Sequence, residues 1–363
     1  MAIHLMRPAT PYRILCLAGD GIGPEIMSAT CAVLDAVADL LDRPIDLSHA
    51  VIGFDALAAE GSTIPNAVIN AARAADGVLL GPVSHNDYPP VADGGLNPSG
   101  VLRKELSLFA NVRPARSYAD LPRPIGPAID LVVMRENLEG FYADRNMFAG
   151  DGEFSPVDGV ALAMRRITRE ASRNIAMAGF EMAAGRPAKR VTAIHKANVM
   201  RLSDGLFLDT VRAVAAEFPD IAYDEMLVDS AAAMLVRDPG RFDVLVTTNM
   251  FGDILSDLAA ELSGSLGLAG SLNVGRQHVA AQAQHGSAPD IAGQDRANPV
   301  SLILSAAMLL AHLGETSAAA AINDAVDAAL GDAARRTADV GGDLGCRDFA
   351  THLCTFIRGK VQA

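Results

Sequence analysis

The sequence is short of basic residues, and this shortage narrows the class of partner. It contains 30 lysines and arginines against 43 aspartates and glutamates, which gives a formal charge of −13 at pH 7. A surface with this balance repels nucleic-acid phosphates and anionic membrane headgroups. We therefore expect neither of them as a partner, and an anionic ligand would need a locally basic pocket.

Cysteines are few and follow no recognisable pattern. The four are Cys16, Cys31, Cys346 and Cys354, and no two of them form a C-x-x-C pair. Neither a zinc site nor a disulfide framework is therefore predicted, and a reducing cytoplasm is the expected compartment.

Long hydrophobic runs are also missing. The longest, LILSAAMLLAHL, is too short and too interrupted by serine and histidine to span a bilayer, so it predicts a buried helix. The N-terminal MAIHLMRPATPYR has no hydrophobic region typical of a secretory signal. Half of the 363 residues are apolar, which favours a soluble globular protein of about two domains.

Short β-rich runs alternate with helical periods along most of the chain. RILCLAGD precedes PEIMSATCAVLDAVADLL, and FDVLVTTNMFG precedes DILSDLAAELSG. This alternation is typical of an α/β protein. Between about 114 and 160 the pattern loosens, which indicates a separate lobe with an extended arm. The alanine-rich helices of the C-terminal third need a sheet, and the first third can supply it, so one domain is expected to be discontinuous.

The segment LNPSGVLRKELSLFANVRP, residues 96–114, places Arg103 and Arg113 on either side of a short apolar stretch. Two guanidinium groups brought together can hold carboxylate or phosphate oxygens bidentately. Two solvated surface arginines are the alternative interpretation.

In NMFGDILSDLAAEL, Asp253 and Asp257 are four residues apart, so a helix would place both carboxylates on one face. Their repulsion is relieved when a hard divalent cation lies between them. Asp229, in LVDSAAAML, is a candidate third ligand, and a helix N-cap is its equally plausible alternative role.

Lys196 follows His195 at the end of an apolar, strand-like run, where a desolvated lysine near a metal can serve in proton transfer. A lysine that only reaches solvent is the alternative. The stretch VVMRENLEGFY adds Arg135 and Tyr142, whose phenol can donate a proton, although a half-buried structural tyrosine is more frequent.

Two glycine-containing loops are less specific. GDGIGPE at 19–25 fits neither phosphate-loop pattern, and it predicts a strand-to-helix turn with Pro24 in the first turn of the helix. HGSAPDIAGQDRANP at 285–299 contains Asp290, and an acid beside an adenosine ribose favours NAD over NADP.

Taken together and in this order, these motifs resemble the β-decarboxylating dehydrogenases, the isocitrate/isopropylmalate dehydrogenase family, which also includes homoisocitrate and tartrate/D-malate dehydrogenases. The resemblance covers nearly all of residues 13–350. It is carried by GDGIGPE, LRKELSLFANVRP, RENLEGFY, HKANVM, FDVLVTTNMFGDILSD, GSLGLAGSLNVG and HGSAPDIAGQDRANP.

The resemblance implies an α/β, isopropylmalate dehydrogenase-like two-domain fold that is not a Rossmann fold. Residues 1–108 and 264–363 would form a discontinuous cofactor-side domain. Residues 109–263 would form the substrate, metal and dimerisation domain, with an arm near 140–160. The family is also built as a homodimer whose active sites take residues from both subunits.

The resemblance further implies the roles of the catalytic and substrate-binding residues. Arg103, Arg113 and Arg135 match the arginines that bind the malate carboxylates. Tyr142 matches the tyrosine that helps to protonate the product enol, and Lys196 matches the lysine that the neighbouring subunit contributes.

Metal and cofactor residues are implied in the same way. Asp253 and Asp257 match Mg²⁺ or Mn²⁺ ligands of one subunit, and Asp229, also expected to be catalytic, matches the ligand from the other. Asp290 stands where NAD-using members keep an acid, so NAD is the expected cofactor. The other residues expected to bind it are His285, Gly286, Ser287, Ala288 and Asn298.

Substrate choice depends on the positions just before the first arginine, where isopropylmalate enzymes usually present leucines. Here Asn97 and Ser99 are polar, which favours a substrate with a polar or carboxylate tail, such as isocitrate or homoisocitrate. Isopropylmalate, tartrate and D-malate remain alternatives, as does a catalytically silent regulatory subunit. The segment HVAAQAQ, before His285, departs from the F-E-P-V that is common in the family.

Overall fold

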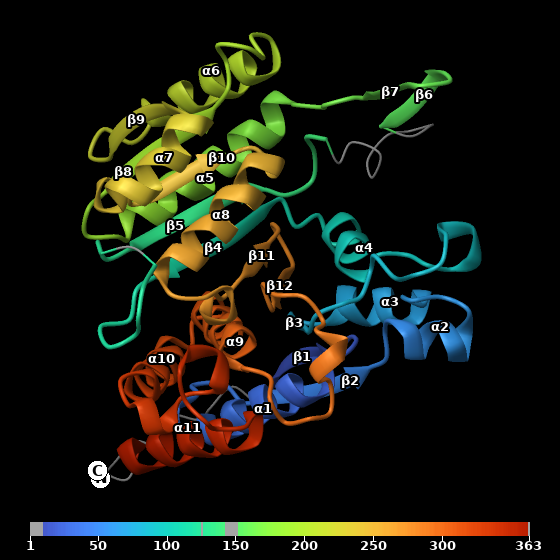
Figure 1. Ribbon diagram of the computed structural model, residues 1–363, viewed down its shortest axis with the longest axis vertical. Helices are drawn as coiled ribbons and strands as arrows, with labels where there is room; N and C mark the ends of the chain where they lie inside the picture. Colours follow the sequence, from blue (N-terminus) through green and yellow to red (C-terminus); the bar gives the residue numbers. More distant parts are fainter. Residues whose placement is uncertain (1–9, 125, 142–151, 362–363) are drawn as a thin grey trace.

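The computed structural model describes residues 10–124, 126–141 and 152–361 (Figure 1). Its described strands form a ten-stranded sheet in the order β2-β1-β3-β12-β11-β4-β5-β10-β8-β9, and a separate hairpin of β6 and β7. The strands are β1 (Tyr12–Leu17), β2 (Ile45–Ala50), β3 (Gly77–Leu80), β4 (Ala110–Arg116), β5 (Asp130–Glu136), β6 (Glu153–Val157), β7 (Val160–Ala163), β8 (Arg190–His195), β9 (Ala222–Leu227), β10 (Val244–Thr247), β11 (Leu272–Val274) and β12 (Val279–Gln282).

Helices cover both faces of the large sheet (Figure 1). They are α1 (Gly23–Ala36), α2 (Phe54–Glu60), α3 (Asn66–Ala74), α4 (Pro98–Glu105), α5 (Arg169–Ala184), α6 (Ser203–Ala215), α7 (Val228–Arg237), α8 (Asn249–Ser263), α9 (Val300–His312), α10 (Thr316–Leu330) and α11 (Cys346–Val361). The α/β fold class is confirmed.

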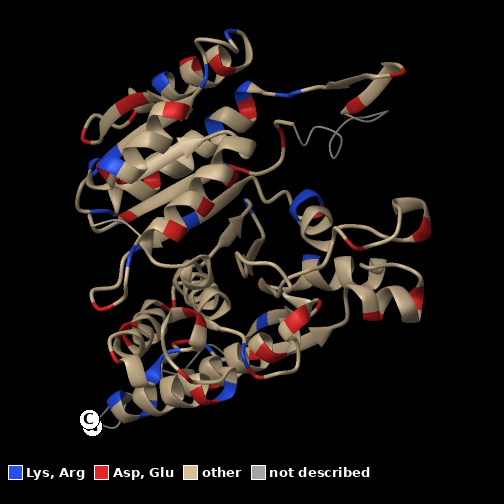
Figure 2. Ribbon diagram, in the orientation of Figure 1, with Lys and Arg blue, Asp and Glu red and all other residues tan. Residues whose placement is uncertain are grey.

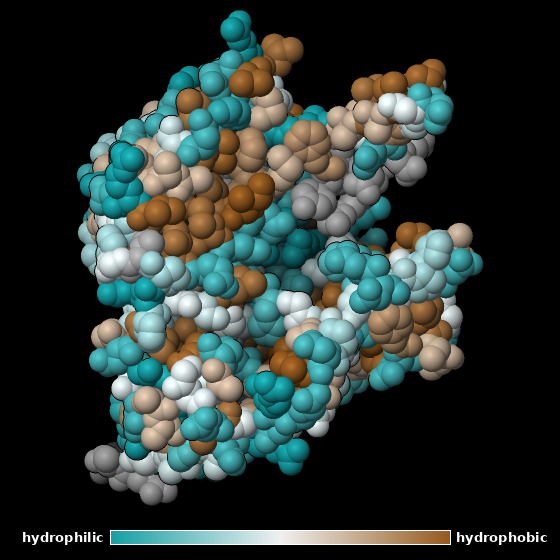
Figure 3. All heavy atoms as spheres, viewed as in Figure 1, coloured by the Kyte–Doolittle hydropathy of each residue, from teal (hydrophilic) through white to brown (hydrophobic). Residues whose placement is uncertain are grey.

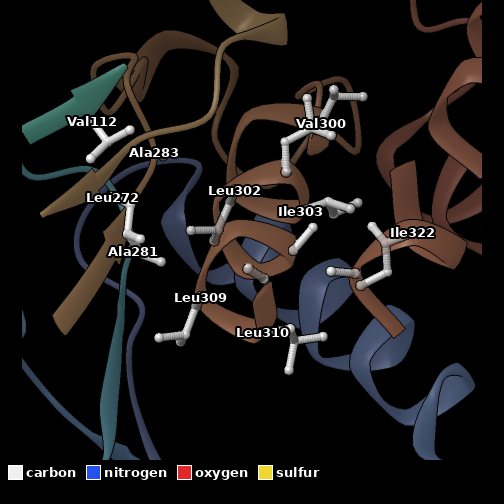
Figure 4. Packing of buried hydrophobic residues seen from close by; sticks show 14 of the residues in the cluster. Val112, Leu272, Ala281, Ala283, Val300, Leu302, Ile303, Leu309, Leu310 and Ile322 are labelled. Atoms are coloured by element: carbon white, nitrogen blue, oxygen red, sulfur yellow. The ribbon is translucent and has the colours of Figure 1, made fainter. Parts of the chain in front are cut away.

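The inner strands are apolar because helices bury them on both sides. Every residue of β3 and β10 is buried, which is the pattern of parallel strands between two helical layers. The buried helix predicted from LILSAAMLLAHL is α9, and ten of its thirteen residues are buried. Figure 4 shows its leucine and isoleucine side chains between strand residues such as Leu272 and the α10 residue Ile322.

Antiparallel strand pairs in the middle of the large sheet join its two halves. β11 pairs antiparallel with both β12 and β4, and β4 pairs antiparallel with β5, whereas the outer strands pair in parallel. The strands on the β2 side of these pairs come from residues 12–80 and 272–282, and those on the β9 side from residues 110–247. This arrangement is compatible with a discontinuous first domain, but the domain boundaries stay a prediction.

The β6–β7 hairpin projects away from the large sheet (Figure 1). All of its residues are exposed, including the apolar Phe154, Val157 and Leu162. It lies at the C-terminal end of the predicted arm, part of which falls outside the described residues.

None of the helices in the described ranges is long and apolar enough to cross a membrane. The compartment of the protein stays a prediction.

Candidate active site

A cavity of about 260 Å³ opens where α4, the β4–β5 pair, α8 and the segment after β12 meet. The space-filling view shows the surface hollowed between α8 and α4, with a mainly hydrophilic lining (Figure 3). All five residues predicted to bind substrate line it, namely Asn97, Ser99, Arg103, Arg113 and Arg135. Residues from three separate parts of the sequence are thus brought together.

Arg113 and Arg135 lie on the neighbouring strands β4 and β5, and both are buried. Helix α8 packs across these strands, and it can approach closely because it has a glycine at the crossing point. A Cβ atom built on Gly252 would lie 2.7 Å from Cβ and Cγ of Arg135. The local chain thus holds the two guanidinium groups directly under the acidic face of α8.

Carboxylates of α8 compensate the buried arginine charges. Arg113 Nη1 donates to Asp257 Oδ1 at 2.9 Å and lies 3.3 Å from Asp253 Oδ1. Arg135 Nη1 donates to the same Asp253 oxygen, and its Nε donates to Asn249 Oδ1 at 3.0 Å. Figure 2 shows acidic and basic positions side by side where α8 crosses the strands. Buried cations require such pairing, because an isolated charge would be strongly destabilising.

Asp253 and Asp257 occupy one face of α8, as the four-residue spacing predicts. Their side chains are 38% and 49% exposed, so a cation can reach their oxygens from the solvent. Hard carboxylate oxygens suit Mg²⁺ or Mn²⁺, and the donor set therefore fits the expected metal. A bound cation would compete with Arg113 for these oxygens.

Lys196 and Asp229 form a second group. Lys196 directly follows β8, and its Nζ donates to Asp229 Oδ1 at 2.5 Å. This hydrogen bond from the lysine lowers the pKa of Asp229. Leu227 is the N-cap of α7, and Asp229 lies in the first turn of that helix, so the alternative N-cap role of Asp229 is wrong.

The three aspartates predicted to bind metal are not assembled within one chain. Across the described part of the protein, the only group of three or more potential metal ligands is formed by Cys16, Cys31 and His49. Asp253 and Asp257 therefore form one partial site, and Asp229 belongs with Lys196 to another.

The start of α4 faces the cavity with polar side chains. The Asn97 side-chain oxygen accepts from the Gly100 amide at 3.2 Å and thus caps the helix. Ser99 Oγ donates to Gln282 Oε1 at 2.9 Å, and Arg103 Nη2 lies 3.5 Å from the same oxygen. Gln282 therefore links a predicted tail-binding residue to a predicted carboxylate-binding residue.

Gln282 and Gln284 are site residues that the motifs did not identify. Both line the cavity, and Gln284 Nε2 donates to Asp257 Oδ1 at 3.0 Å. Their only signal in the sequence was the departure of HVAAQAQ from the common family pattern.

The predicted cofactor residues divide between the cavity and the surrounding framework. His285 and Gly286 line the cavity, and burial lowers the pKa of His285. Ser287 turns inward, where its Oγ lies 2.7 Å from Ser84 Oγ. Asn298 donates to Asp339 Oδ2 at 2.9 Å, whereas Asp290 is exposed.

The loop GDGIGPE packs directly against this cofactor segment. The Ile22 amide donates to the Ser287 carbonyl at 2.9 Å. Gly21 has φ of +57°, and a Cβ atom there would lie 2.0 Å from the Ser287 oxygen, so only glycine fits. Helix α1 begins at Gly23 with a proline in its first turn, as predicted.

The motif RENLEGFY ends at Tyr142, which lies outside the described residues. Its two acids are buried and line a neighbouring cavity that also contacts Arg103. Burial raises the pKa of Glu136 to about 7. The Glu136 carboxylate accepts from the amides of Leu138 at 2.7 Å and Glu139 at 3.0 Å. Burial also raises the pKa of Glu139.

Comparison with known proteins supplies the wider context. Residues 13–353 match the isocitrate/isopropylmalate dehydrogenase family. The chain is 41% identical to 3-isopropylmalate dehydrogenase of Archaeoglobus fulgidus, over 95% of this chain and 99% of the relative. It is 43% identical to isocitrate/homoisocitrate dehydrogenase of Thermus thermophilus, over 92% and 94% of the two chains.

Two further comparisons agree with these. The chain is 40% identical to the human mitochondrial isocitrate dehydrogenase [NAD] subunit alpha, over 95% of this chain and 90% of the relative. The crystal structure of isocitrate dehydrogenase from Methylococcus capsulatus superposes with a TM-score of 0.86 at 38% identity, covering 96% of this chain and 99% of that one.

Proposed function

The chain belongs to the isocitrate/isopropylmalate dehydrogenase family, and from that premise we propose that it catalyses the NAD-dependent oxidative decarboxylation of a 3-substituted malate. The observation that carries the proposal is the convergence of Arg103, Arg113 and Arg135 on one cavity beside Asp253. Three guanidinium groups can bind the two carboxylates of a malate core and can also contact a third carboxylate, carried by the tail at C3.

The chemistry gives each predicted residue a role. The arginines orient the substrate, and Lys196 in its neutral form accepts the proton of the C2 hydroxyl. Asp229, its hydrogen-bond partner, stabilises the ammonium group that results. After CO₂ leaves C3, Tyr142 donates a proton to that carbon. Asp253 and Asp257 would hold a divalent cation, which would supply Lewis-acid polarisation of the C2 oxygen, and NAD would supply the hydride acceptor.

The proposed substrate carries a polar or carboxylate tail, as isocitrate and homoisocitrate do. Ser99, Gln282 and Arg103 form a hydrogen-bonded group on the α4 side of the cavity. An apolar tail placed there would shield this polar group from water and offer it no hydrogen bond, at a cost of about 1–3 kcal/mol. The 43% identity to an isocitrate/homoisocitrate dehydrogenase supports the same choice.

3-Isopropylmalate is the second candidate substrate. The 3-isopropylmalate dehydrogenase of Archaeoglobus fulgidus is similar over nearly its whole length. Val83 and Ala283 also line the cavity and would contact an apolar tail. Tartrate and D-malate are further alternatives.

A panel of five substrates tests the proposal. NADH formation would be followed with Mg²⁺ and isocitrate, homoisocitrate, 3-isopropylmalate, tartrate or D-malate. We expect kcat/KM for isocitrate or homoisocitrate to exceed that for isopropylmalate at least about tenfold. Preference for isopropylmalate would contradict the proposal that the substrate carries a polar or carboxylate tail. Inactivity on all five substrates would favour a catalytically silent subunit.

Ser99→Ala sharpens the same experiment, because D-malate has no tail. The substitution should lower kcat/KM for the preferred tail-bearing substrate about tenfold while leaving the rate with D-malate nearly unchanged. Equal losses on both substrates would place Ser99 outside the tail pocket.

We propose further that two copies of the chain share each active site. Asp253 and Asp257 lie in one partial site and Lys196 with Asp229 in another, so a second subunit would be needed to complete the set. The discontinuous domain formed by residues 1–108 and 264–363 would then carry the NAD-binding segment.

A further inference from the structure

Three side chains with metal-binding atoms meet at the β2 edge of the sheet, away from the residues proposed for catalysis. Sγ of Cys16, Sγ of Cys31 and a ring nitrogen of His49 all lie within 4.8 Å of one another. They come from β1, α1 and β2, respectively.

The register of the sheet explains why they meet. Cys16 and His49 are direct partners in the parallel β1–β2 pair, so both side chains project from the same face. Helix α1 packs on that face and presents Cys31, which contacts the same hydrophobic core as Cys16. Three structural elements therefore fix the positions of the three ligands.

The distances suit a small tetrahedral ion. Zinc–sulfur bonds of about 2.3 Å place two thiolates about 3.8 Å apart around the metal. Because the three ligand atoms already lie within 4.8 Å, each needs to move by only about 1 Å or less. Such a shift is within the reach of side-chain rotation.

Burial and charge also favour a soft cation at this position. Cys16 is buried, Cys31 is half-buried and His49 is exposed, so the group is open to solvent on one side only. Two thiolates and a neutral imidazole balance the charge of Zn²⁺, which removes most of the cost of burying the ion. The group offers no carboxylate, so Mg²⁺ would find no suitable ligand.

We propose that Cys16, Cys31 and His49 bind one zinc ion, with a water molecule from the exposed side as the fourth ligand. The ion links β1, α1 and β2, and it is separate from the cation expected at Asp253 and Asp257. The site is therefore a structural element of the β2 edge, independent of the proposed reaction.

Cobalt substitution tests this site directly. Under a phosphine reductant that keeps the thiols reduced, the full-length protein titrated with Co²⁺ should develop a thiolate-to-cobalt charge-transfer band. One equivalent of Zn²⁺ should remove the band. Carboxylate ligands give no such band, so Co²⁺ at Asp253 and Asp257 does not interfere.

Matched variants distinguish this group from the other cysteines. Cys31→Ser should abolish the band, and His49→Ala should weaken Zn²⁺ affinity at least about tenfold. Cys354→Ser is the control, because that buried cysteine lies on α11 outside the group, and it should keep the band. Absence of the band in the unsubstituted protein, or its survival in Cys31→Ser, would overturn the proposal.

Thermal unfolding provides a second measurement that does not depend on the cobalt charge-transfer band. Zn²⁺ should raise the Tm of the unsubstituted protein and of Cys354→Ser, because a ligand that binds the folded state stabilises it. The Tm of Cys31→Ser should rise clearly less, because only the carboxylates of Asp253 and Asp257 remain to bind the ion. An equal rise in all three proteins would place the zinc elsewhere and contradict the assignment.

Discussion

Arg113 and Arg116 illustrate how burial separates a binding residue from a surface residue on one strand. Both lie on β4, but the Arg113 side chain is 9% exposed beneath α8, whereas that of Arg116 is 42% exposed beside Asp327. Surface ion pairs contribute little to stability, typically about 0–1 kcal/mol. The cavity therefore depends on Arg113 and not on Arg116.

We predict that Arg113→Met lowers kcat/KM at least about 100-fold, because one carboxylate of the substrate loses its charged partner. Stability should also fall by about 1–3 kcal/mol, because the methionine cannot donate to the buried Asn111 Oδ1 as Arg113 Nε does. Arg116→Met is the matched control and should keep near-normal kinetics. Unchanged kcat/KM in Arg113→Met would remove this residue from the substrate site.

Glu136 gives the protein a predicted pH dependence of stability. Burial raises the pKa of this carboxyl from its ordinary value of 4.5 to about 7. Between these two values the folded protein keeps a proton that the unfolded chain has lost. The free energy of unfolding should therefore fall as pH rises through this window, by up to about 3 kcal/mol.

Urea unfolding of the wild type and Glu136→Gln at several pH values between 4.5 and 7.5 measures this effect. The variant should be less stable at the lower end, because its amide nitrogen cannot accept from the Glu139 amide. Its stability should, however, depend less steeply on pH. Glu153→Gln, at an exposed position, is the control, and identical pH slopes in wild type and Glu136→Gln would contradict the prediction.

At the scale of elements, the position of α8 over β4 and β5 decides the geometry of the site. Asp253 contacts both arginines and Asp257 contacts Arg113 because the helix lies close to Arg135 at Gly252. The neighbouring surface over α7 and α8 is apolar, with exposed Val236 and Ile254 (Figure 3). An unpartnered apolar area of this kind is compatible with the proposed second subunit.

We predict that Gly252→Ala lowers kcat/KM at least about tenfold, because the new methyl group forces α8 away from Arg135 and moves the carboxylates with it. Stability should also fall by about 1–3 kcal/mol. Gly205→Ala, in α6, is the matched control. No atom lies near its built Cβ, so the substitution should stabilise the protein by up to about 1 kcal/mol. Equal behaviour of the two variants would contradict this account of α8.

At the scale of the whole molecule, the predicted catalytic residues lie in two separate groups. The arginines line a cavity together with Asp253, and Lys196 pairs with Asp229 at the end of β8. Lys196, the proposed base, is not among the described residues that line the carboxylate-binding cavity of its own chain. Two chains related by a twofold axis would supply each cavity with the group from the partner.

Mixing two inactive variants tests this arrangement. Arg113→Met and Lys196→Met should each lose activity, and a 1:1 mixture refolded together should recover about 25% of wild-type activity. Half of the dimers formed at random contain both variants, and one of their two sites is intact. Size-exclusion chromatography would establish that each variant keeps its oligomeric state. No recovery in mixed dimers would mean that each site is built from one chain.

The sequence by itself predicted the features that depend on local periodicity and on motif order. The α/β class, the buried helix α9, the proline in the first turn of α1 and the strand before Lys196 all follow from patterns within a few residues. The same holds for the shared face of Asp253 and Asp257. These features were predictable because a helical or strand period is set by neighbouring residues.

Only the tertiary structure decided which distant segments meet. The antiparallel crossing through β11 and β12 brings Gln282 to Ser99 and Arg103, which no local pattern could predict. Strand order likewise places Cys16 beside His49, although cysteine spacing alone had argued against a metal site. The strand order also separates Asp229 from the aspartates of α8. Side-chain proximity across a sheet depends on register and strand order, and these are properties of the whole chain rather than of any one segment.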